Sequence, residues 1–169
     1  MAEEPVLVAV CGPPGVGKSL VARTAADAVG GAVLRTDIVR QDLFDDPGYT
    51  DREVECVYAE MCDRARERLT AGTSVVLDGT HRSVALREAV AGVGEALERP
   101  AVFLRVTCPA SAVRDRIAAR TDDPSEAEFE DYRAIAAEFE PIERGHHVID
   151  NAGTVERTRQ QVCTALEGF

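Results

Sequence analysis

The sequence predicts an α/β fold of three layers, in which helices cover both faces of a five-stranded parallel sheet. Five short apolar runs alternate with helical patterns along the chain, and this alternation is typical of parallel sheets built from strand–helix–strand units with right-handed crossovers. With 169 residues, of which 45% are hydrophobic, the chain is long enough to bury one core. We therefore expect a single domain over residues 1–169.

A glycine-rich stretch follows the first predicted strand, which covers residues 5–11. It fits the pattern G-x-x-x-x-G-K-[ST] and leads into a helix expected over residues 18–29. Its glycines allow the backbone to curl with the N–H groups pointing inward, where they and the helix N-terminus can surround a phosphate group. The stretch therefore predicts a phosphate-binding loop (P-loop), with these residues at the nucleotide: Gly12, Pro13, Pro14, Gly15, Val16, Gly17, Lys18, Ser19 and Leu20.

Two side chains of the P-loop suit the chemistry of a nucleotide. Lys18 is the only lysine of the chain, and a compact ammonium here can contact the β- and γ-phosphates of ATP, so we expect it to be catalytic. The hydroxyl of Ser19 suits Mg²⁺, which prefers oxygen ligands. Both cofactors, ATP and Mg²⁺, are therefore expected at this loop.

The second strand, expected over residues 32–35, is followed by Asp37 and Arg40 at its carboxyl end. Ligands of open α/β sheets bind at this end of the strands. Asp37 is a candidate general base for the hydroxyl of an acceptor, although an aspartate at this position can also cap a helix. Arg40 lies on the same helical face and can hold an anionic or polar group of the acceptor; the alternative is an ordinary solvated arginine.

The third strand, expected over residues 74–78, follows a helix that opens with the capping box Thr50–Glu53. Asp78 ends this strand, where a carboxylate can orient Mg²⁺ together with Ser19. The next residue is Gly79, and not the second acid that often activates water in motor ATPases. This favours transfer of phosphate to a bound acceptor over hydrolysis.

The rest of the chain predicts, in order, a helix over 83–98, a strand over 101–107, a helix over 109–120, a helix with an apolar stripe from Phe129 to Phe139, a strand over 147–150 and a helix from Thr154. Arg116 and Arg120 lie four residues apart on one helical face, where two like charges are unfavourable unless an anion lies between or above them. With Asp122-Asp123-Pro124 just beyond, they predict a mobile, arginine-bearing lid over residues 109–128, whose charge stabilises the transferring phosphoryl group. The alternative is a solvated basic face.

The composition argues against several classes of protein. A formal net charge of −11 disfavours non-specific adhesion to nucleic acid or to anionic membranes. No apolar run approaches the ~18 residues of a membrane span and no basic leader is evident, so we expect a cytoplasmic protein without a membrane partner. The five cysteines show no C-x-x-C pairing and lie at apolar positions, so we expect them to be reduced and buried, without a metal.

Taken together, these motifs resemble the P-loop kinases of the polynucleotide-kinase type, whose relatives include zeta-toxin-like, gluconate-kinase-like and chloramphenicol-phosphotransferase-like enzymes. The segments that carry the resemblance are Gly12 to Ser19, Thr36 to Arg40, Val76 to His81 with Arg87 beyond, Cys108-Pro109, the pair Arg116 and Arg120, and Asp150 to Gly153. Gly79 and His81 depart from the family, in which alanine and asparagine or phenylalanine are commoner.

The resemblance implies the sheet order 2-3-1-4-5 and a role for each motif. Asp37 is implied as the general base and Arg40 as a ligand of the acceptor phosphate. Arg116 and Arg120 are implied as nucleotide-binding lid residues, and Asn151 as a neighbour of the adenine. Acceptor contacts are expected at Asp37, Arg40, Asp78, Thr80 and Arg87.

The expected function is an ATP- and Mg²⁺-dependent kinase that transfers the γ-phosphate to a hydroxyl, with the 5′-OH of a polynucleotide as the leading acceptor. A polynucleotide needs a local basic cluster on this acidic chain, for which the sequence offers Arg40, Arg82 and Arg87. The alternatives are a kinase of small alcohols, such as sugars, nucleosides or antibiotics, and a non-catalytic ATP-binding switch or sensor. A GTPase is excluded because its Asn-Lys-x-Asp motif needs a second lysine. The sequence leaves the oligomeric state open.

Overall fold

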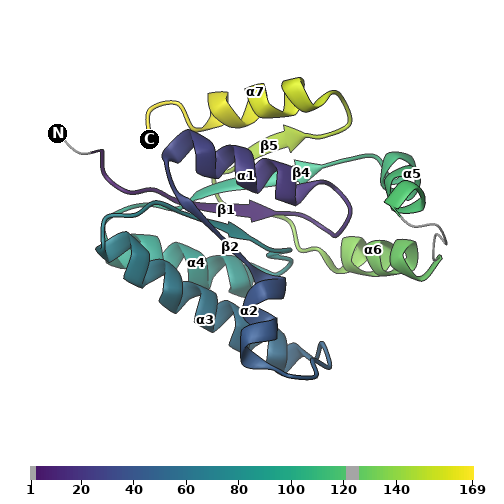
Figure 1. Ribbon diagram of the computed structural model, residues 1–169, viewed down its shortest axis with the longest axis horizontal. Coiled ribbons are helices and arrows are strands. Elements are labelled where there is room, and N and C mark those ends of the chain that lie inside the picture. Colours follow the sequence, from purple (N-terminus) through teal and green to yellow (C-terminus); the bar gives the residue numbers. More distant parts are fainter. Residues whose placement is uncertain (1–2, 121–125) are drawn as a thin grey trace.

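The computed structural model describes residues 3–120 and 126–169, except for the side chains of residues 120, 126 and 127. Five strands form one parallel sheet in the order β2-β3-β1-β4-β5, which confirms the predicted fold class and sheet order (Figure 1). The strands are β1 (Leu7–Cys11), β2 (Ala32–Arg35), β3 (Val75–Asp78), β4 (Val102–Thr107) and β5 (His147–Asp150). The helices are α1 (Lys18–Val29), α2 (Thr36–Leu43), α3 (Asp51–Thr70), α4 (Val84–Ala96), α5 (Ala110–Arg120), α6 (Glu126–Glu138) and α7 (Val155–Ala165).

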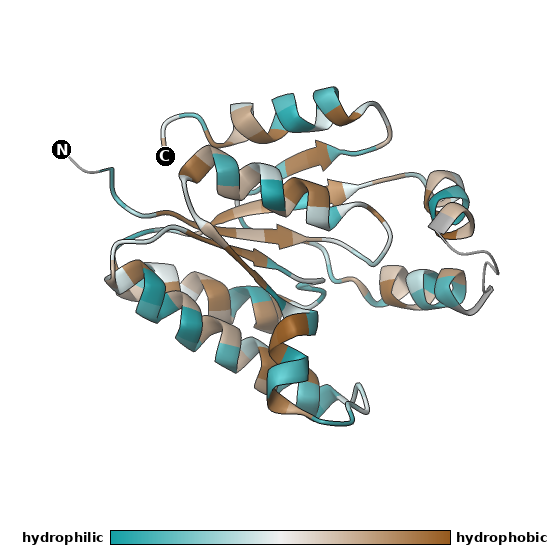
Figure 2. Ribbon diagram, in the orientation of Figure 1, coloured by the Kyte–Doolittle hydropathy of each residue, from teal (hydrophilic) through white to brown (hydrophobic). Residues whose placement is uncertain are grey.

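The sheet separates two hydrophobic cores. Helices α1 and α7 cover one face and α3 and α4 cover the other, while α5 and α6 lie beyond the carboxyl ends of the strands (Figure 1). Alternate residues of β1 serve the two cores: Val8 and Val10 face α1 and α7, whereas Leu7 and Ala9 face α3 and α4. The central strand is therefore apolar throughout, as the colouring of Figure 2 shows for the middle of the sheet.

The sequence analysis placed Asp37 and Arg40 on a helical face but gave helix α2 no bounds. The helix has only eight residues and starts directly at the end of β2, with Arg35 at the capping position and no side-chain cap. A sequence gives little warning of such a helix, because the usual N-terminal signal is absent. Its position matters for function, since it carries both Asp37 and Arg40.

The capping box at the start of α3 forms only in half. The hydroxyl of Thr50 accepts a hydrogen bond from the N–H of Glu53 at 3.2 Å, as predicted. The carboxylate of Glu53 reaches further back than the motif requires and accepts from the N–H groups of Gly48 and Tyr49, at 2.9 and 2.7 Å. It thereby holds Tyr49, which has a φ of 56°, in the left-handed region.

The predicted burial of all five cysteines is wrong for two of them. All are free thiols; Cys11 and Cys62 are buried and Cys108 is half-buried, but Cys56 and Cys163 are exposed. Each exposed cysteine is next to a buried valine on its helix, and neighbouring helical residues point about 100° apart. Within the described ranges, no group of three or more His, Cys, Asp and Glu side chains could hold a metal, and no helix is long and apolar enough to cross a membrane.

Arg87, a predicted acceptor ligand, is instead a buried link between two loops. Its guanidinium donates to the carbonyl of His81 at 2.6 Å and to the carbonyls of Glu140 and Pro141, both at 2.9 Å. Burial lowers the pKa of this arginine. Arg87 therefore connects the loop after β3 to the segment after α6. Because its guanidinium is used in these contacts, it is not among the acceptor ligands.

Replacement of Arg87 by methionine is expected to lower the free energy of unfolding by about 3 kcal/mol, because three buried carbonyls lose a charged donor. The measurement is reversible urea denaturation. The control is Arg66→Met, which removes an exposed arginine paired with Asp63 on α3 and should change stability by less than about 0.5 kcal/mol. Equal effects of the two substitutions would show that the Arg87 link contributes no more than a surface ion pair.

Candidate active site

The P-loop connects β1 to α1 at the carboxyl edge of the sheet. Gly15 and Gly17 have φ of 84° and 95°, values that side-chain-bearing residues rarely adopt. A Cβ at Gly17 would lie 2.0 Å from the amide nitrogen of Asn151, so only glycine fits there. The first turn of α1 has no side-chain cap and no acidic residue, which leaves its N–H groups suited to an anion.

Lys18 and Ser19 point to different partners at the start of α1. The Lys18 ammonium donates to the carbonyl of Pro13 at 2.9 Å, within the P-loop itself. The hydroxyl of Ser19 donates to Oδ2 of Asp78 at 3.3 Å. Asp78 is opposite Val10 in the register of β3 and β1, so the parallel sheet delivers this carboxylate to the P-loop.

The oxygens of Ser19 and Asp78 form a set that fits Mg²⁺. Mg²⁺ takes one or two protein oxygens and completes its shell with water and substrate phosphates. Asp78 is almost fully buried, and burial raises the pKa of its carboxyl, an effect that Lys18, Arg35 and the Ser19 hydrogen bond oppose. A divalent cation at this carboxylate would favour the ionised form in the same way.

Asp37 lies in the first turn of α2, one residue after the start of that helix, and is not its capping residue. Its Oδ1 accepts from the N–H of Ile38 at 3.0 Å, and its Oδ2 accepts from Arg35 at 2.8 Å. The side chain is about half exposed, at 52%. Asp37 therefore combines a local helix contact with an accessible carboxylate at the carboxyl end of β2.

Arg35 joins the two carboxylates of the site. Its Nε lies 4.0 Å from Oδ2 of Asp78, while its terminal nitrogen binds Asp37. The sequence analysis did not select Arg35. The available signal was its place as the last residue of a strand, immediately before the segment that carries Asp37 and Arg40.

Next to the P-loop lies a cavity of about 800 Å³, which we term the acceptor cavity. Its walls come from the P-loop, from α2, α3 and the loop between them, from the loop after β3, and from α5 and α6. The lining residues are Pro14, Gly15, Thr36, Arg40, Tyr49, Val54, Tyr58, Thr80, Arg82, Ile117, Glu128, Asp131, Ala134 and Ile135. The structure thus brings two predicted acceptor residues, Arg40 and Thr80, to one cavity with the P-loop.

The loop after β3 supports this cavity through a buried His81. The ring Nδ1 of His81 lies 2.9 Å from the carbonyl of Val10, and Tyr58 accepts from the His81 N–H at 2.9 Å. Burial lowers the pKa of His81 to about 4 and raises the pKa of Tyr58 to about 12. A Cβ at Gly79 would lie 2.6 Å from the Tyr58 hydroxyl, which explains the glycine at this position.

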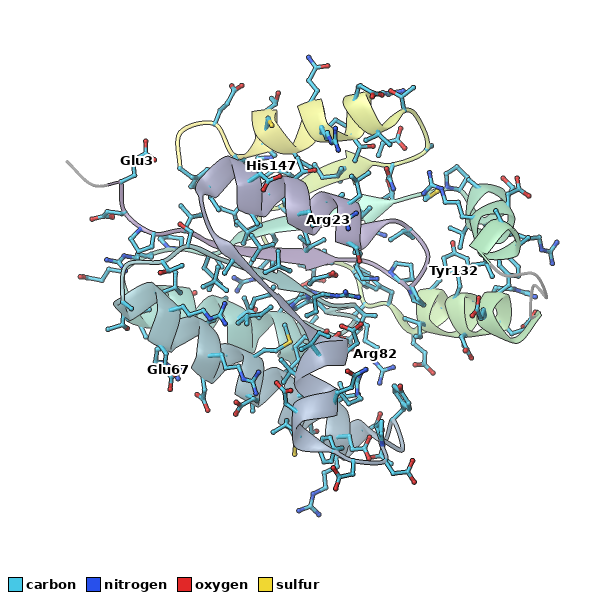
Figure 3. The ribbon with its side chains drawn as sticks, viewed as in Figure 1. Glu3, Arg23, Glu67, Arg82, Tyr132 and His147 are labelled. Atoms are coloured by element: carbon cyan, nitrogen blue, oxygen red, sulfur yellow. The ribbon has the colours of Figure 1, made fainter. Side chains whose placement is uncertain are left out.

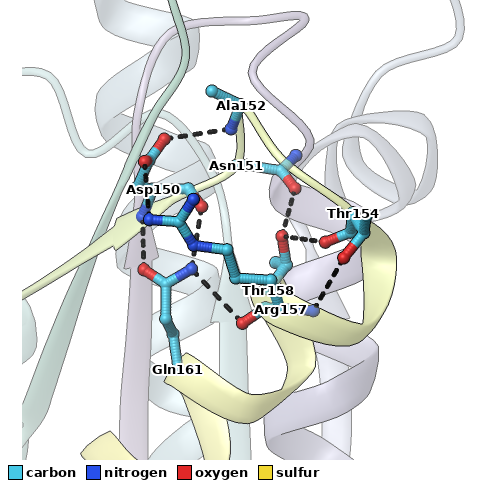
Figure 4. A network of polar contacts seen from close by, with 7 residues as sticks. All are labelled: Asp150, Asn151, Ala152, Thr154, Arg157, Thr158 and Gln161. Atoms are coloured by element: carbon cyan, nitrogen blue, oxygen red, sulfur yellow. Dashed lines mark hydrogen bonds and ion pairs between the residues drawn. The ribbon is translucent and has the colours of Figure 1, made fainter.

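Arg116 and Asn151 hold the P-loop from the side of α5 and β5. Arg116 donates to the carbonyls of Asn151 and Val16, at 2.5 and 3.5 Å. The Asn151 amide donates to the carbonyl of Val16 at 2.8 Å, and its oxygen accepts from Thr158 at 2.7 Å, a contact drawn in Figure 4. Both functional ends of the Asn151 side chain thus bind protein groups, so its proximity to adenine stays a prediction.

Two parts of the predicted site remain to be placed. The side chain of Arg120 and residues 121–125 lie outside the described part of the chain, so the predicted lid over 109–128 is described only in part. Arg82, labelled in Figure 3, lines the acceptor cavity but pairs with Asp51 at 3.3 Å and with Glu138 at 3.7 Å. With Arg87 buried, the basic cluster expected for a polynucleotide does not form as predicted.

Solved structures with the same fold cover almost the whole chain. A gluconokinase from Sinorhizobium meliloti 1021 has a TM-score of 0.78 and 18% identity, over 97% of this chain and 93% of that one. A sugar kinase from Janibacter sp. HTCC2649 has a TM-score of 0.76 and 20% identity, over 96% and 95% of the two chains. The APS kinase of Mycobacterium tuberculosis, in complex with AMPPNP and APS, has a TM-score of 0.78 and 17% identity, over 98% and 99%.

Sequence relatives and a family model extend the comparison. An uncharacterised protein of Mycobacterium tuberculosis is 36% identical in an alignment of 164 residues that covers 90% of this chain and 33% of that protein. A UPF0200 protein of Aeropyrum pernix is 39% identical over 100 residues, 53% of each chain. The chain spans about a third of the length of the mycobacterial relatives it matches. A family model described as an AAA domain matches residues 7–142.

The buried His81 is expected to make stability depend on pH. Its pKa is about 4 in the folded protein, against 6.5 as the ordinary value, so the unfolded chain binds a proton first as the pH falls. Stability from this group is complete above pH 6.5 and should be lost between pH 6.5 and pH 4, by roughly 3 kcal/mol in total.

The measurement is urea denaturation at pH 7.5, 6, 5 and 4, for the parent and for His81→Asn. Asparagine tolerates the left-handed backbone of this position, where φ is 46°, and does not titrate. The drop in stability should therefore be smaller in the variant. Parallel pH profiles of the two proteins would contradict the assignment.

Proposed function

The chain belongs to the AAA domain family, and on this premise we propose that it is an ATP- and Mg²⁺-dependent kinase that transfers the γ-phosphate to a hydroxyl of a small molecule. The proposal rests on one observation: the P-loop and the acceptor cavity share a wall. Pro14 and Gly15 belong to the P-loop and also line the acceptor cavity of about 800 Å³. A phosphate held by the loop and an acceptor held in the cavity would thus meet at this wall.

The nucleotide is held by the P-loop in this proposal. The N–H groups of the loop and of the first turn of α1 receive the phosphate oxygens, and Lys18 exchanges the Pro13 carbonyl for the β- and γ-phosphates. Ser19 and Asp78 hold Mg²⁺, which when bound neutralises charge on the phosphate oxygens. The AMPPNP in the APS kinase with the same fold supports ATP as the nucleotide.

Asp37 acts as the general base in this proposal. Its carboxylate takes the proton of the acceptor hydroxyl while the hydroxyl oxygen forms a bond to the γ-phosphorus, and the bond from that phosphorus to ADP breaks. Arg35, bound to Asp37 at 2.8 Å, positions the carboxylate. Arg116 contacts the P-loop carbonyl of Val16 and can turn its charge to the transferring phosphoryl group.

A small acceptor fits the cavity better than a polynucleotide. Of the three arginines expected to bind nucleic acid, Arg87 is buried and Arg82 is paired with two carboxylates, which leaves Arg40 alone. The opposite wall carries Glu128 and Asp131, which would repel a phosphate backbone. The gluconokinase, sugar kinase and APS kinase of the same fold are consistent with a small acceptor.

Incubation with γ-labelled ATP, Mg²⁺ and a panel of acceptors tests this function. We expect label to move to a sugar, nucleoside or other small alcohol, and not to a 5′-OH oligonucleotide. Lys18→Ala is the control and should abolish transfer, because the site loses its charge at the β- and γ-phosphates. Efficient labelling of the oligonucleotide would restore the polynucleotide acceptor, and tight ATP binding without any transfer would indicate a sensor.

Asp37→Asn separates the base from nucleotide binding. Asparagine keeps the shape of the side chain but cannot accept the proton, so transfer should fall by on the order of 10²-fold or more while ATP affinity stays unchanged. The readouts are the initial rate of transfer and the dissociation constant of ATP by calorimetry. The control is Asp42→Asn, which should retain activity. Asp42 lies on the same helix as Asp37, is exposed, and pairs with Arg64 of α3. Near-normal transfer by Asp37→Asn would leave Asp37 with only its contact to the helix.

A further inference from the structure

The acceptor cavity contains two charges of opposite sign that have no ionic partner within the described ranges. Arg82, the other arginine of this cavity, is paired with Asp51 at 3.3 Å and with Glu138 at 3.7 Å. Arg40 and Asp131 also line the cavity, and neither of them forms an ion pair with a described residue.

Arg40 lies on α2 with its guanidinium 4.9 Å from the centre of the Tyr49 ring. Its Nε is buried and has no hydrogen-bond partner. The backbone of the neighbouring Tyr49 is held by Glu53, which accepts from the N–H of Tyr49 at 2.7 Å. A donor that is buried without a partner is costly, so an anionic group of a ligand in this cavity would satisfy it.

Asp131 lies on α6, on the other side of the acceptor cavity from α2. Glu128 lies three residues before it on the same helix and also lines the cavity, so two carboxylates face the same space. This wall of the cavity is therefore acidic, which favours a cationic group of a ligand beside it. The nearby lining residues Ile117, Ala134 and Ile135 are apolar, which strengthens an interaction between Asp131 and a bound cation.

We propose that the acceptor is a zwitterion, a small hydroxyl compound whose acidic group binds Arg40 and whose basic amine binds Asp131. The inference rests on the proposed kinase function and names the chemical class of its acceptor. A compound with both groups can pair with Arg40 and with Asp131 at once. A purely anionic sugar would leave Asp131 without a cation and would place a second negative charge near it. Asp131 is thus a specificity-determining residue, and it takes no part in the transfer step.

The test uses two matched sets of acceptors with γ-labelled ATP. The six-carbon set is sorbitol, gluconate, glucamine and 2-amino-2-deoxygluconate, and the three-carbon set is glycerol, glycerate, 2-aminopropane-1,3-diol and serine. Within at least one set, kcat/KM should be highest for the zwitterion, by about tenfold over each singly charged acceptor, the usual size of one charged hydrogen bond.

Two variants assign the charges. Asp131→Asn should lower kcat/KM about tenfold for acceptors with an amine and leave the others unchanged, and Arg40→Gln should do the same for acceptors with an acid. Glu130→Gln is the matched control: it removes a carboxylate from the adjacent position of α6 that pairs with Arg133 and does not line the cavity. It should leave all acceptors unchanged.

The outcomes separate the two proposals. If Asp131→Asn lowers transfer equally for all acceptors, Asp131 does not recognise the amine, and the proposal of a zwitterionic acceptor is ruled out. Transfer only to acceptors that lack an amine or an acid, in these sets or in the wider panel, also overturns it and leaves the kinase standing. Transfer to no acceptor in either set or in the wider panel contradicts the kinase function itself.

Discussion

One hydrogen bond, from the N–H of Gly12 to the carbonyl of Thr80 at 3.1 Å, joins the two halves of the candidate site. It fixes the start of the P-loop against the loop after β3, two residues beyond Asp78. Because β1 and β3 are parallel neighbours, the carboxylate of Asp78 and the hydroxyl of Ser19 then meet at the same edge. The position of the P-loop relative to the loop after β3 consequently depends on this contact between adjacent strands.

A buried polar network supports that contact from the side of α3 and α4. His81 Nδ1 lies beside the carbonyl of Val10, Tyr58 accepts from the backbone N–H of His81, and Arg87 donates to the carbonyl of His81. Loss of any one of these contacts would leave a further buried polar group without a partner. The Tyr58 hydroxyl also takes the space of a side chain at position 79, which explains why Gly79 departs from the commoner alanine of the motif.

The sequence predicted the strands and the P-loop, because periodicity and glycine spacing are local signals. The sheet order followed from the resemblance to P-loop kinases and not from periodicity. The sequence also selected Asp37, Arg40 and Thr80, whose positions at strand ends follow from parallel topology. It failed where tertiary contacts decide: Arg87 has the same sequence signal as a ligand arginine, and only packing shows that its donors are used by carbonyls. Arg35 and Asp131 were not selected, since only the folded chain brings Arg35 beside Asp37 and Asp78 and brings Asp131 to the cavity.

The single lysine has a consequence for the covalent chemistry of this protein. Lys18 lies partly buried in the P-loop, and the surface cations of the chain are arginines. Reagents and enzymes that acylate ε-amino groups therefore find one target side chain, and it is the one that the phosphate site needs. Acylation at this position would remove the charge as completely as a mutation does. A count of acyl groups on lysine would thus be a direct count of molecules with a blocked P-loop.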